Sequence, residues 1–271
     1  MKQLKSSIED LREIFEKGIN AGCITEPLCS FDKSTTAQNV KKILNENNYD
    51  VVGVRTNGII NGYAYKIELA EGQLGKYFNE FDLHKILPDT ISIAEVLKLL
   101  NNSNHIFISS FGIVSGIITR GDLQKMPIRM WLFSLISLIE MQMLRIIREQ
   151  FPDKSWVTLI STERKEKAEN LLRDRKNKNE EIDLVDCLEF CDEYKIISKM
   201  KDLLEKLPCC KKKKEFCAKM KEFRELRDNL AHSQDIITAS WPNIINLSNT
   251  AEKFLTIFET FNSGKNNKDK N

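Results

Sequence analysis

The first half of the chain contains the same segment twice, and this internal repeat limits the possible folds more than any other feature. Residues 58–69 align without gaps on residues 112–123. Upstream of each copy lies a short amphipathic segment, at 37–44 and at 93–100, followed by an Asn-rich turn and an apolar run. A period near 3.6 residues predicts a helix, and an apolar run between turn residues predicts a strand. Each copy is therefore predicted to form a helix, a strand, a turn, a second strand and a short helix.

The second copy ends in a motif whose residue types suit nucleotide binding. It reads Gly116-Ile-Ile-Thr119-Arg-Gly-Asp122. A hydroxyl at the start of a helix can hold a phosphate, and a carboxylate can accept hydrogen bonds from both ribose hydroxyls. The unit resembles the CBS domain, a family in which tandem pairs bind adenosine nucleotides in the cleft between the two copies. The resemblance covers roughly residues 20–125. It implies that Gly116, Thr119 and Asp122 bind ATP, ADP or AMP as a regulatory ligand.

The first copy departs from this motif. Its equivalent residues are Gly62, Tyr65 and Glu68, so that a tyrosine replaces the threonine. We therefore expect one competent nucleotide site or none. With none, the repeat would be a degenerate pair that acts as a dimerisation scaffold.

After Pro127 the strand signals stop and long helical patterns follow. The predicted helices are Ile128–Gln150, Thr162–Lys178, Leu184–Lys206, Lys212–Leu230 and Asn243–Phe261. Together they read as an all-α bundle at residues 127–261. A further helix is predicted at residues 1–19, and the polar tail at 262–271 is expected to be disordered. The fold class is thus α+β, with a repeat of α/β units at 20–125 and a helical bundle behind it.

The helix at 212–230 leads into the segment Arg227-Asp228-Asn229-Leu230-Ala231-His232. An arginine, four intervening residues and a histidine, near the end of a late helix in a small bundle, resemble the motif of HEPN-superfamily ribonucleases. That family also favours a polar residue after the arginine, here Asp228. The resemblance covers roughly residues 127–261, and it implies that Arg227, Asp228 and His232 form part of a catalytic site.

The residue types agree with metal-independent cleavage of RNA through its own 2′-hydroxyl. A histidine has an ordinary pKa of about 6.5, which suits a general base near neutral pH. An arginine forms paired hydrogen bonds to phosphate oxygens and can stabilise the charge that develops there. HEPN nucleases use two copies of the motif that face each other across a dimer. The resemblance therefore implies a homodimer, with the apolar face of the helix at 128–150 as its interface, and products that end in a 2′,3′-cyclic phosphate.

Purely structural roles remain open for the same residues. Arg227 could pair with Asp228, Glu225 or Glu222 on the helix surface, and His232 could be a residue favoured by the helix dipole. The bundle could also keep the motif for binding a partner. The basic stretch at 211–214 could guide an RNA backbone or be a solvated loop.

Composition excludes several classes of function. The net charge is only +2, so a nucleic-acid or membrane partner would need a local patch. The most apolar stretch, 128–144, is interrupted by Arg129 and Glu140, which suits a buried or interface helix better than a membrane span. The N-terminus lacks the apolar core of a signal peptide, so we expect a cytoplasmic protein. The seven cysteines lack CxxC spacing and are expected to be free thiols, without a metal site.

These inferences combine into one hypothesis. The chain is a nucleotide-regulated, metal-independent RNA endonuclease that acts as a homodimer. The alternative is a non-enzymatic regulator that senses an adenosine nucleotide and binds a protein partner through its helical domain.

Overall fold

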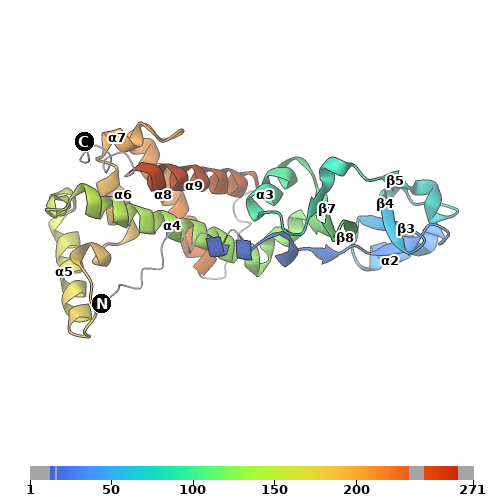
Figure 1. The fold of residues 1–271 in the computed structure, drawn as a ribbon, viewed down its shortest axis with the longest axis horizontal. Helices are drawn as coiled ribbons and strands as arrows, with labels where there is room; N and C mark the ends of the chain where they lie inside the picture. Colours follow the sequence, from blue (N-terminus) through green and yellow to red (C-terminus); the bar gives the residue numbers. More distant parts are fainter. Residues whose placement is uncertain (1–12, 16, 232–240, 262–271) are drawn as a thin grey trace. The chain divides into compact units, whose positions relative to one another are not determined.

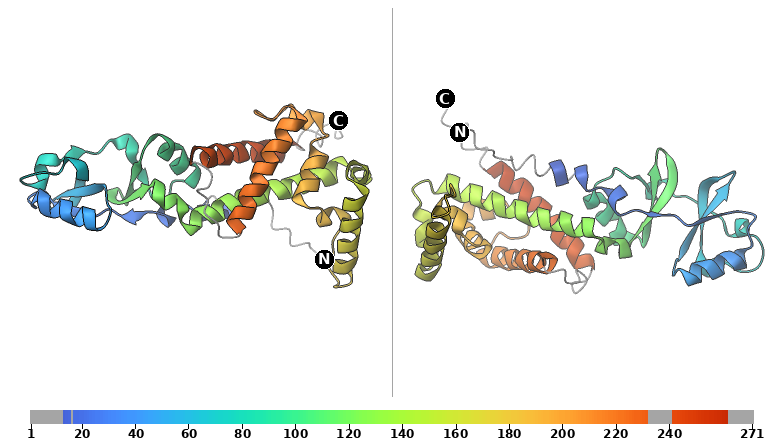
Figure 2. Two further views of the ribbon diagram at one scale, coloured as in Figure 1. Left: turned by 180° about the vertical axis from the view of Figure 1, so that it is seen from behind. Right: turned by 90° about the horizontal axis from the view of Figure 1, so that it is seen from below.

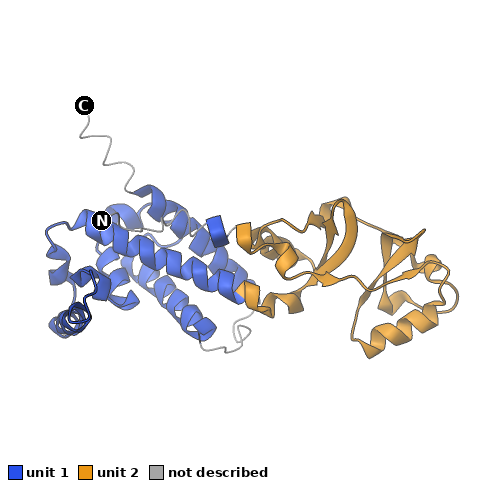
Figure 3. Cartoon of the chain, turned by 60° about the horizontal axis from the view of Figure 1, so that its bottom comes forward, with its two compact units in different colours: residues 1–15, 129–271 blue, residues 16–128 orange. Residues whose placement is uncertain are grey.

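The structure is a computed structural model that describes residues 13–15, 17–231 and 241–261 (Figure 1). The chain divides into two compact units, coloured separately in Figure 3. Residues 16–128 form the repeat unit, and residues 1–15 with 129–271 form the helical unit. Most of the helix predicted at 1–19, and all of the tail predicted at 262–271, lie outside the described residues.

Both copies of the repeat have the predicted order of elements, which confirms that prediction. A helix precedes a hairpin of two antiparallel strands, and a short 3-10 helix follows. The first copy contains α2 (Ala37–Glu46), β3 (Val51–Thr56), β4 (Ile59–Tyr65) and η2 (Lys66–Glu68). The second copy contains α3 (Ile93–Asn102), β7 (His105–Ser110), β8 (Ile113–Thr119) and η5 (Arg120–Gln124).

The strand that leads into each copy pairs with the other copy. Strand β1 (Glu26–Pro27) precedes the first copy but pairs with β8 of the second. Strand β5 (Asn79–Glu80) precedes the second copy but pairs with β4 of the first. The strands β2 (Ser30–Asp32) and β6 (Ile86–Pro88) pair in parallel with β3 and β7 of their own copies. The two sheets, β2-β3-β4-β5 and β1-β8-β7-β6, are thus joined by a reciprocal exchange of strands.

Strand β3 is buried on both faces, which explains its run of apolar residues. Val52 and Val54 pack with one face of α2 in a cluster that also includes Leu44. Val51 points the other way and packs against Phe107 of the second copy. Aromatic rings from both copies extend this second cluster: Tyr63, Tyr65, Phe81, His105 and Phe107. The two copies therefore share one core.

Gly62 of β4 and Gly116 of β8 occupy equivalent positions opposite the exchanged strands. A Cβ atom at Gly62 would lie 2.5 Å from the carbonyl oxygen of Asn79, and one at Gly116 would lie 2.2 Å from the Cγ2 atom of Thr25. Neither distance is compatible with van der Waals contact. Glycine at both positions is therefore what lets the other copy's leading strand approach.

The helical unit contains, among its described residues, α4 (Met126–Gln150), α5 (Thr162–Lys176), α6 (Phe190–Ile197), α7 (Lys201–Leu204), α8 (Lys213–Ala231) and α9 (Trp241–Phe261). The first residues counted in α4 belong to the repeat unit. In Figure 2, α8 crosses α4 obliquely in the left view and α9 crosses α4 in the right view. Phe216 and Phe223 of α8 pack on Phe254 of α9, with ring centroids 6.1 and 5.8 Å apart. Core packing of aromatic rings therefore holds α8 to α9.

Two arginines of α4 cap the ends of its neighbours. The Arg129 guanidinium donates to the carbonyls of Asn229 and Leu230, and the Arg145 guanidinium donates to those of Phe258 and Glu259. Cations at these carbonyls satisfy groups that a helix end leaves unpaired. By length and composition α4 could cross a membrane, but 61% of its most apolar window is buried inside the protein. Burial of this kind is expected of a core helix.

The single helix predicted from Leu184 to Lys206 is wrong. The structure has a 3-10 helix, η7 (Leu184–Cys187), and then the separate helices α6 and α7. Asp186 accepts a hydrogen bond from the backbone N–H of Asp183, and Asp192 accepts one from that of Glu189. Both pairs are capping boxes, in which acidic side chains bond the backbone and start a new helix. The apolar period continues across these starts, which is why the sequence pattern did not reveal them.

We expect Gly62→Ala to destabilise the repeat unit by about 1–3 kcal/mol, the usual cost of overpacking. The carbonyl oxygen of Asn79 cannot move away from the new methyl group without breaking the pairing of β4 with β5. Urea unfolding measures the effect. Gly121→Ala is the matched control, since its Cβ atom would meet only the Thr119 hydroxyl, at 3.5 Å. Equal losses in the two variants would contradict the close-approach explanation.

Candidate functional site

A cavity of about 790 Å³ lies in the repeat unit, and both copies line it. The residues just before β3 and β7 contribute Asp50 and Asn104, which are equivalent in the two copies. The end of β8 and the start of η5 contribute the segment 119–122, and the exchanged strand β1 contributes Glu26. The cavity therefore depends on the strand exchange as well as on the repeat.

Two of the predicted nucleotide-binding residues line this cavity, and the third lies behind it. Thr119 and Asp122 face the cavity. Gly116 lies within β8, paired with Pro27 of β1, and it is absent from the cavity lining. Because Gly116 has no side chain, β1 can approach β8, and β1 carries Glu26 to the cavity lining.

The Asp122 carboxylate is already engaged by neighbouring groups. Its Oδ2 atom accepts hydrogen bonds from the backbone N–H and the hydroxyl of Thr119, at 2.7 and 2.8 Å. Its Oδ1 atom lies 3.0 Å from the Lys125 ammonium. A carboxylate has about four acceptor positions. Bonding to both ribose hydroxyls therefore requires one of the present partners to move, and Lys125 is the one attached through a flexible side chain.

Lys125 links this carboxylate to the exchanged strand. Its ammonium donates to the carbonyl oxygen of Ile24 at 2.7 Å and forms an ion pair with Glu26. Partial burial lowers the pKa of Lys125, but pairing with Glu26 and Asp122 outweighs it, so that the pKa is raised overall. The lysine therefore stays charged and holds β1 against the end of η5.

Carboxylates outnumber cations among the described residues that line the cavity. Glu26, Asp50 and Asp122 are acidic, and Arg120 is the one lysine or arginine among them. The Arg120 guanidinium is turned to the carbonyl oxygens at the end of α3, with Nε 3.2 Å from that of Leu100. Asp50 is ion-paired with Lys66, 2.9 Å away, and Glu26 and Asp122 share Lys125. Little positive charge is therefore left to balance an anion with several charges.

The first copy uses its tyrosine differently. Tyr65, at the position of Thr119, packs edge-on against Tyr63 and His105, with ring centroids 5.3 and 5.9 Å apart. It lines a separate cavity of about 510 Å³ together with Lys41 and Lys66. Burial, and then the charge of Lys85, lower the pKa of His105, which lines both cavities. Neutral aromatic groups thus fill the region between the two copies.

The sequence reasoning missed Glu26, Asp50 and His105 as lining residues. A usable signal existed for Asp50, because it and Asn104 hold the same place in the repeat, just before a strand. No such signal existed for Glu26, because its strand joins the other copy.

In the helical unit, Arg227 is held by groups from three helices. Its Nη1 atom lies 3.0 Å from Oε2 of Glu140 on α4, and its Nη2 atom lies 3.4 Å from Oδ1 of Asp228 on α8. The guanidinium also lies over the ring of Phe190 on α6, 5.1 Å from the centroid. The Arg227 side chain is 24% exposed, whereas that of Asp228 is 53% exposed. His232 lies outside the described residues, so the structure places one end of the predicted motif only.

A second carboxyl group is buried beside this ion pair. Glu193 of α6 is 1% exposed, and its Oε2 atom has no hydrogen-bond partner among the described residues. Burial raises the pKa of Glu193 well above its ordinary value, the charge of Glu140 raises it further, and Arg227 opposes both. One arginine therefore lies beside two carboxyl groups, and burial favours the protonated form of Glu193.

All seven cysteines are free thiols. Within the described ranges, no group of three or more His, Cys, Asp and Glu residues is arranged to hold a metal ion.

The CBS domain family matches residues 82–127. The second copy of the repeat is therefore a CBS domain, as predicted, while the match reaches neither the first copy nor the helical unit. No curated protein matches the chain.

Several solved structures are similar to part of the chain. The AMP complex of CBSX2 is 17% identical, with a TM-score of 0.35, over 39% of this chain and 93% of its own. An uncharacterized conserved protein from Pyrococcus horikoshii is 18% identical, with a TM-score of 0.35, over 40% and 91%. The CBS domain of a bacterial CNNM/CorC family Mg²⁺ transporter, in complex with ATP, is 16% identical, with a TM-score of 0.34, over 43% and 91%.

We expect Glu193→Gln to stabilise the helical unit at pH 7 by about 1 kcal/mol, a typical size for the effect of one substitution. The folded-state pKa of Glu193 lies above its ordinary value of 4.5, so folding favours the protonated form. That contribution is complete below pH 4.5 and is lost as the pH rises through the folded-state pKa. The advantage of glutamine should therefore grow with pH and vanish in acid.

Urea unfolding of the helical unit between about pH 4 and pH 8 measures this difference. Glu225→Gln, at an exposed position of α8, is the control and should follow the wild type at every pH. A Glu193→Gln variant that is less stable than the wild type at pH 7 would mean that the buried group is ionised and held by Arg227.

Proposed function

We propose that the repeat unit binds an adenosine nucleotide in the cavity beside Thr119 and Asp122. The observation that carries this proposal is the cavity itself, about 790 Å³, which brings both motif residues together with residues of the other copy. A volume of this size suits a drug-sized or nucleotide-sized ligand. The match of residues 82–127 to the CBS domain supports the choice of an adenosine nucleotide.

The charges of the cavity favour a nucleotide with few phosphates. Asp50 is paired with Lys66, while Glu26 and Asp122 share the single ammonium of Lys125. Each added phosphate would therefore meet more carboxylate charge than cation charge, and the Arg120 guanidinium already bonds backbone carbonyls. The ammonium of Lys125 can turn from Asp122 to a phosphate and leave an acceptor for a ribose hydroxyl. One such ammonium can balance the charge of one phosphate group. We therefore infer that the preferred ligand is AMP rather than ATP.

Calorimetry with AMP, ADP and ATP, in the absence of Mg²⁺, tests this preference for few phosphates. We expect affinity to fall several-fold with each added phosphate, and the difference to shrink as salt screens the carboxylates. Asp122→Asn should abolish most of the AMP binding, because the amide has one acceptor oxygen and places an N–H donor where the second carboxylate oxygen was. Glu68→Gln, at the equivalent position of the first copy, is the matched control and lies outside this cavity.

Two results would count against the proposal. Tighter binding of ATP than of AMP would contradict the charge argument. Absence of heat with all three nucleotides would leave the repeat as a scaffold.

For the helical unit we propose a metal-independent ribonuclease site that includes Arg227, Asp228 and His232. The observation that favours it is the fixed position of Arg227, one turn before the end of α8, where Glu140 and Phe190 hold the guanidinium plane. A guanidinium held in one orientation loses little freedom when it binds a phosphate. Since each chain supplies one arginine and one histidine, the proposal includes a homodimer in which two motifs meet.

Incubation of the pure protein with RNA in EDTA tests the activity. We expect the wild type to cleave and to leave 2′,3′-cyclic phosphate ends, and Arg227→Ala and His232→Ala each to lower the rate by about 100-fold or more. Arg224→Ala, one turn earlier on α8, is the matched control and should retain the wild-type rate. Light scattering tests the dimer in the same samples.

Equal cleavage by all variants would indicate a contaminating nuclease. No cleavage by the wild type, with or without AMP, would favour the non-enzymatic alternative, in which nucleotide binding controls a protein partner of the helical unit.

A further inference from the structure

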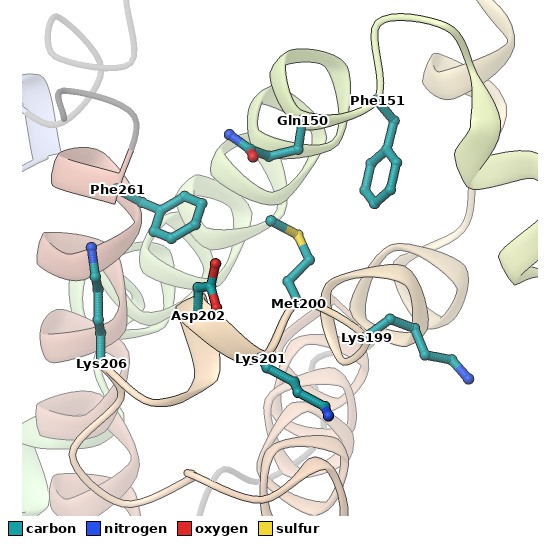
Figure 4. A pocket seen from close by; sticks show the side chains of 8 residues that line it. All are labelled: Gln150, Phe151, Lys199, Met200, Lys201, Asp202, Lys206 and Phe261. Atoms are coloured by element: carbon teal, nitrogen blue, oxygen red, sulfur yellow. The ribbon is translucent and has the colours of Figure 1, made fainter. Parts of the chain in front are cut away.

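The helical unit has a cavity of its own, at a distance from Arg227. It measures about 610 Å³ and lies where the end of α4, the start of α7 and the end of α9 meet (Figure 4). Phe151 follows α4, Phe261 ends α9, and Met200 and Asp202 come from the start of α7. None of these residues belongs to the motif around Arg227.

The interior of this cavity is aromatic and contains one carboxylate. Figure 4 shows the rings of Phe151 and Phe261 and the side chain of Met200 around the middle of the pocket, with the Asp202 carboxylate pointing inward. Asp202 is exposed, and no ion pair or hydrogen bond joins its carboxylate to another residue that the structure describes. An inward carboxylate that lacks a protein partner can accept hydrogen bonds from a ligand.

The rim of the cavity is basic. Lys199 and Lys201 extend outward from the pocket in Figure 4, while the Lys206 ammonium lies 5.0 Å from the centroid of the Phe261 ring. Lys213, at the start of α8, lies close enough to Lys199 to lower the pKa of that lysine. Two neighbouring ammonium groups repel each other, and an anion between them would remove that repulsion.

The interior and the rim of the cavity are therefore suited to different parts of one ligand. The interior suits a flat group that stacks on aromatic rings and carries N–H donors, and the Asp202 carboxylate would repel a phosphate there. The rim suits phosphates. A nucleobase on a sugar–phosphate chain has both properties, and stacking of unpaired bases on aromatic side chains beside lysines is how proteins hold single strands.

We propose that this cavity binds one unstacked base of a single-stranded RNA, and that guanine is the base it favours. Guanine offers two adjacent donors, N1–H and N2–H, to the two oxygens of a carboxylate, whereas adenine and cytosine each offer an amino group alone. The choice of RNA over DNA rests on the ribonuclease activity proposed above. Lys213 begins the helix that carries Arg227 fourteen positions later, or roughly 21 Å at about 1.5 Å per residue. A short oligonucleotide can span that distance, so the cavity would select the sequence beside the cleavage point.

Fluorescence anisotropy with a labelled, uncleavable 2′-O-methyl RNA of about ten nucleotides tests the site on the full chain. We expect Phe151→Ala to weaken binding about tenfold, and Lys199→Glu to weaken it similarly and to reduce its dependence on salt. Phe111→Ala, at a fully exposed aromatic between β7 and β8, and Lys178→Glu, at an exposed lysine, are the matched controls and should bind as the wild type does. Thermal unfolding of each variant shows that it is folded.

The identity of the base is tested by replacing guanine with inosine, which lacks the N2 amino group. The wild type should bind the inosine RNA about fivefold more weakly, as expected for one lost hydrogen bond, and Asp202→Asn should bind both RNAs equally. Equal binding of both RNAs by the wild type, or equal affinity of Phe151→Ala and Phe111→Ala, would overturn the proposal. So would displacement of the RNA by inorganic phosphate at matched concentration, which would indicate a site for anions alone.

This outcome is separate from that of the nuclease assay, since the 2′-O-methyl RNA cannot be cleaved. Binding that depends on Phe151 and Asp202 without any cleavage of ordinary RNA would support the cavity and reject the nuclease. Cleavage of ordinary RNA by a protein whose RNA affinity does not depend on Phe151 or Asp202 would support the nuclease and reject the cavity.

Discussion

The reciprocal exchange of β1 and β5 is the constraint on which the repeat unit depends. Each copy has two long strands of its own, and each completes its sheet with the short strand that leads into the other copy. The exchange requires glycine at Gly62 and at Gly116, because a methyl group there would meet the incoming strand. It also brings Glu26 to the cavity beside Asp122. One steric requirement, met twice, thus underlies the shared core and the candidate nucleotide site.

Much of this fold follows from local sequence patterns. For each part that does not, there is a physical reason. The repeat, the hairpins and the long helices α4, α8 and α9 carry clear periods over many residues. The exchanged strands are two residues long and largely exposed, so no period marks them, and their partners lie in the other copy. The break between Leu184 and Lys206 depends on the acidic caps at Asp183 and Glu189, which an apolar period does not register.

Among the residues of the candidate sites, too, local motifs predicted some and could not predict others. The motif identified Thr119 and Asp122, because their chemistry is local to one turn of chain. The partner of Arg227 is Glu140, 87 positions earlier, and the sequence reasoning considered only its neighbours on the same helix. The raised pKa of Glu193 results from burial among the helices, which no spacing of charged residues reveals. The cavity at Asp202 unites residues from 150 to 261 and has no local signal at all.

Lys125 couples the binding of a ligand at Asp122 to the position of β1. It ties Asp122 to the carbonyl of Ile24 and to Glu26, so a ligand that draws this ammonium away also loosens the anchor of β1. Coupling of this kind is reciprocal: an event that displaces β1 must change the affinity for the ligand by the same factor that the ligand changes the position of β1. The segment that carries β1 is continuous with the N-terminal residues, outside either copy of the repeat. A single lysine side chain is thus the link through which a ligand at Asp122 and the position of β1 affect each other.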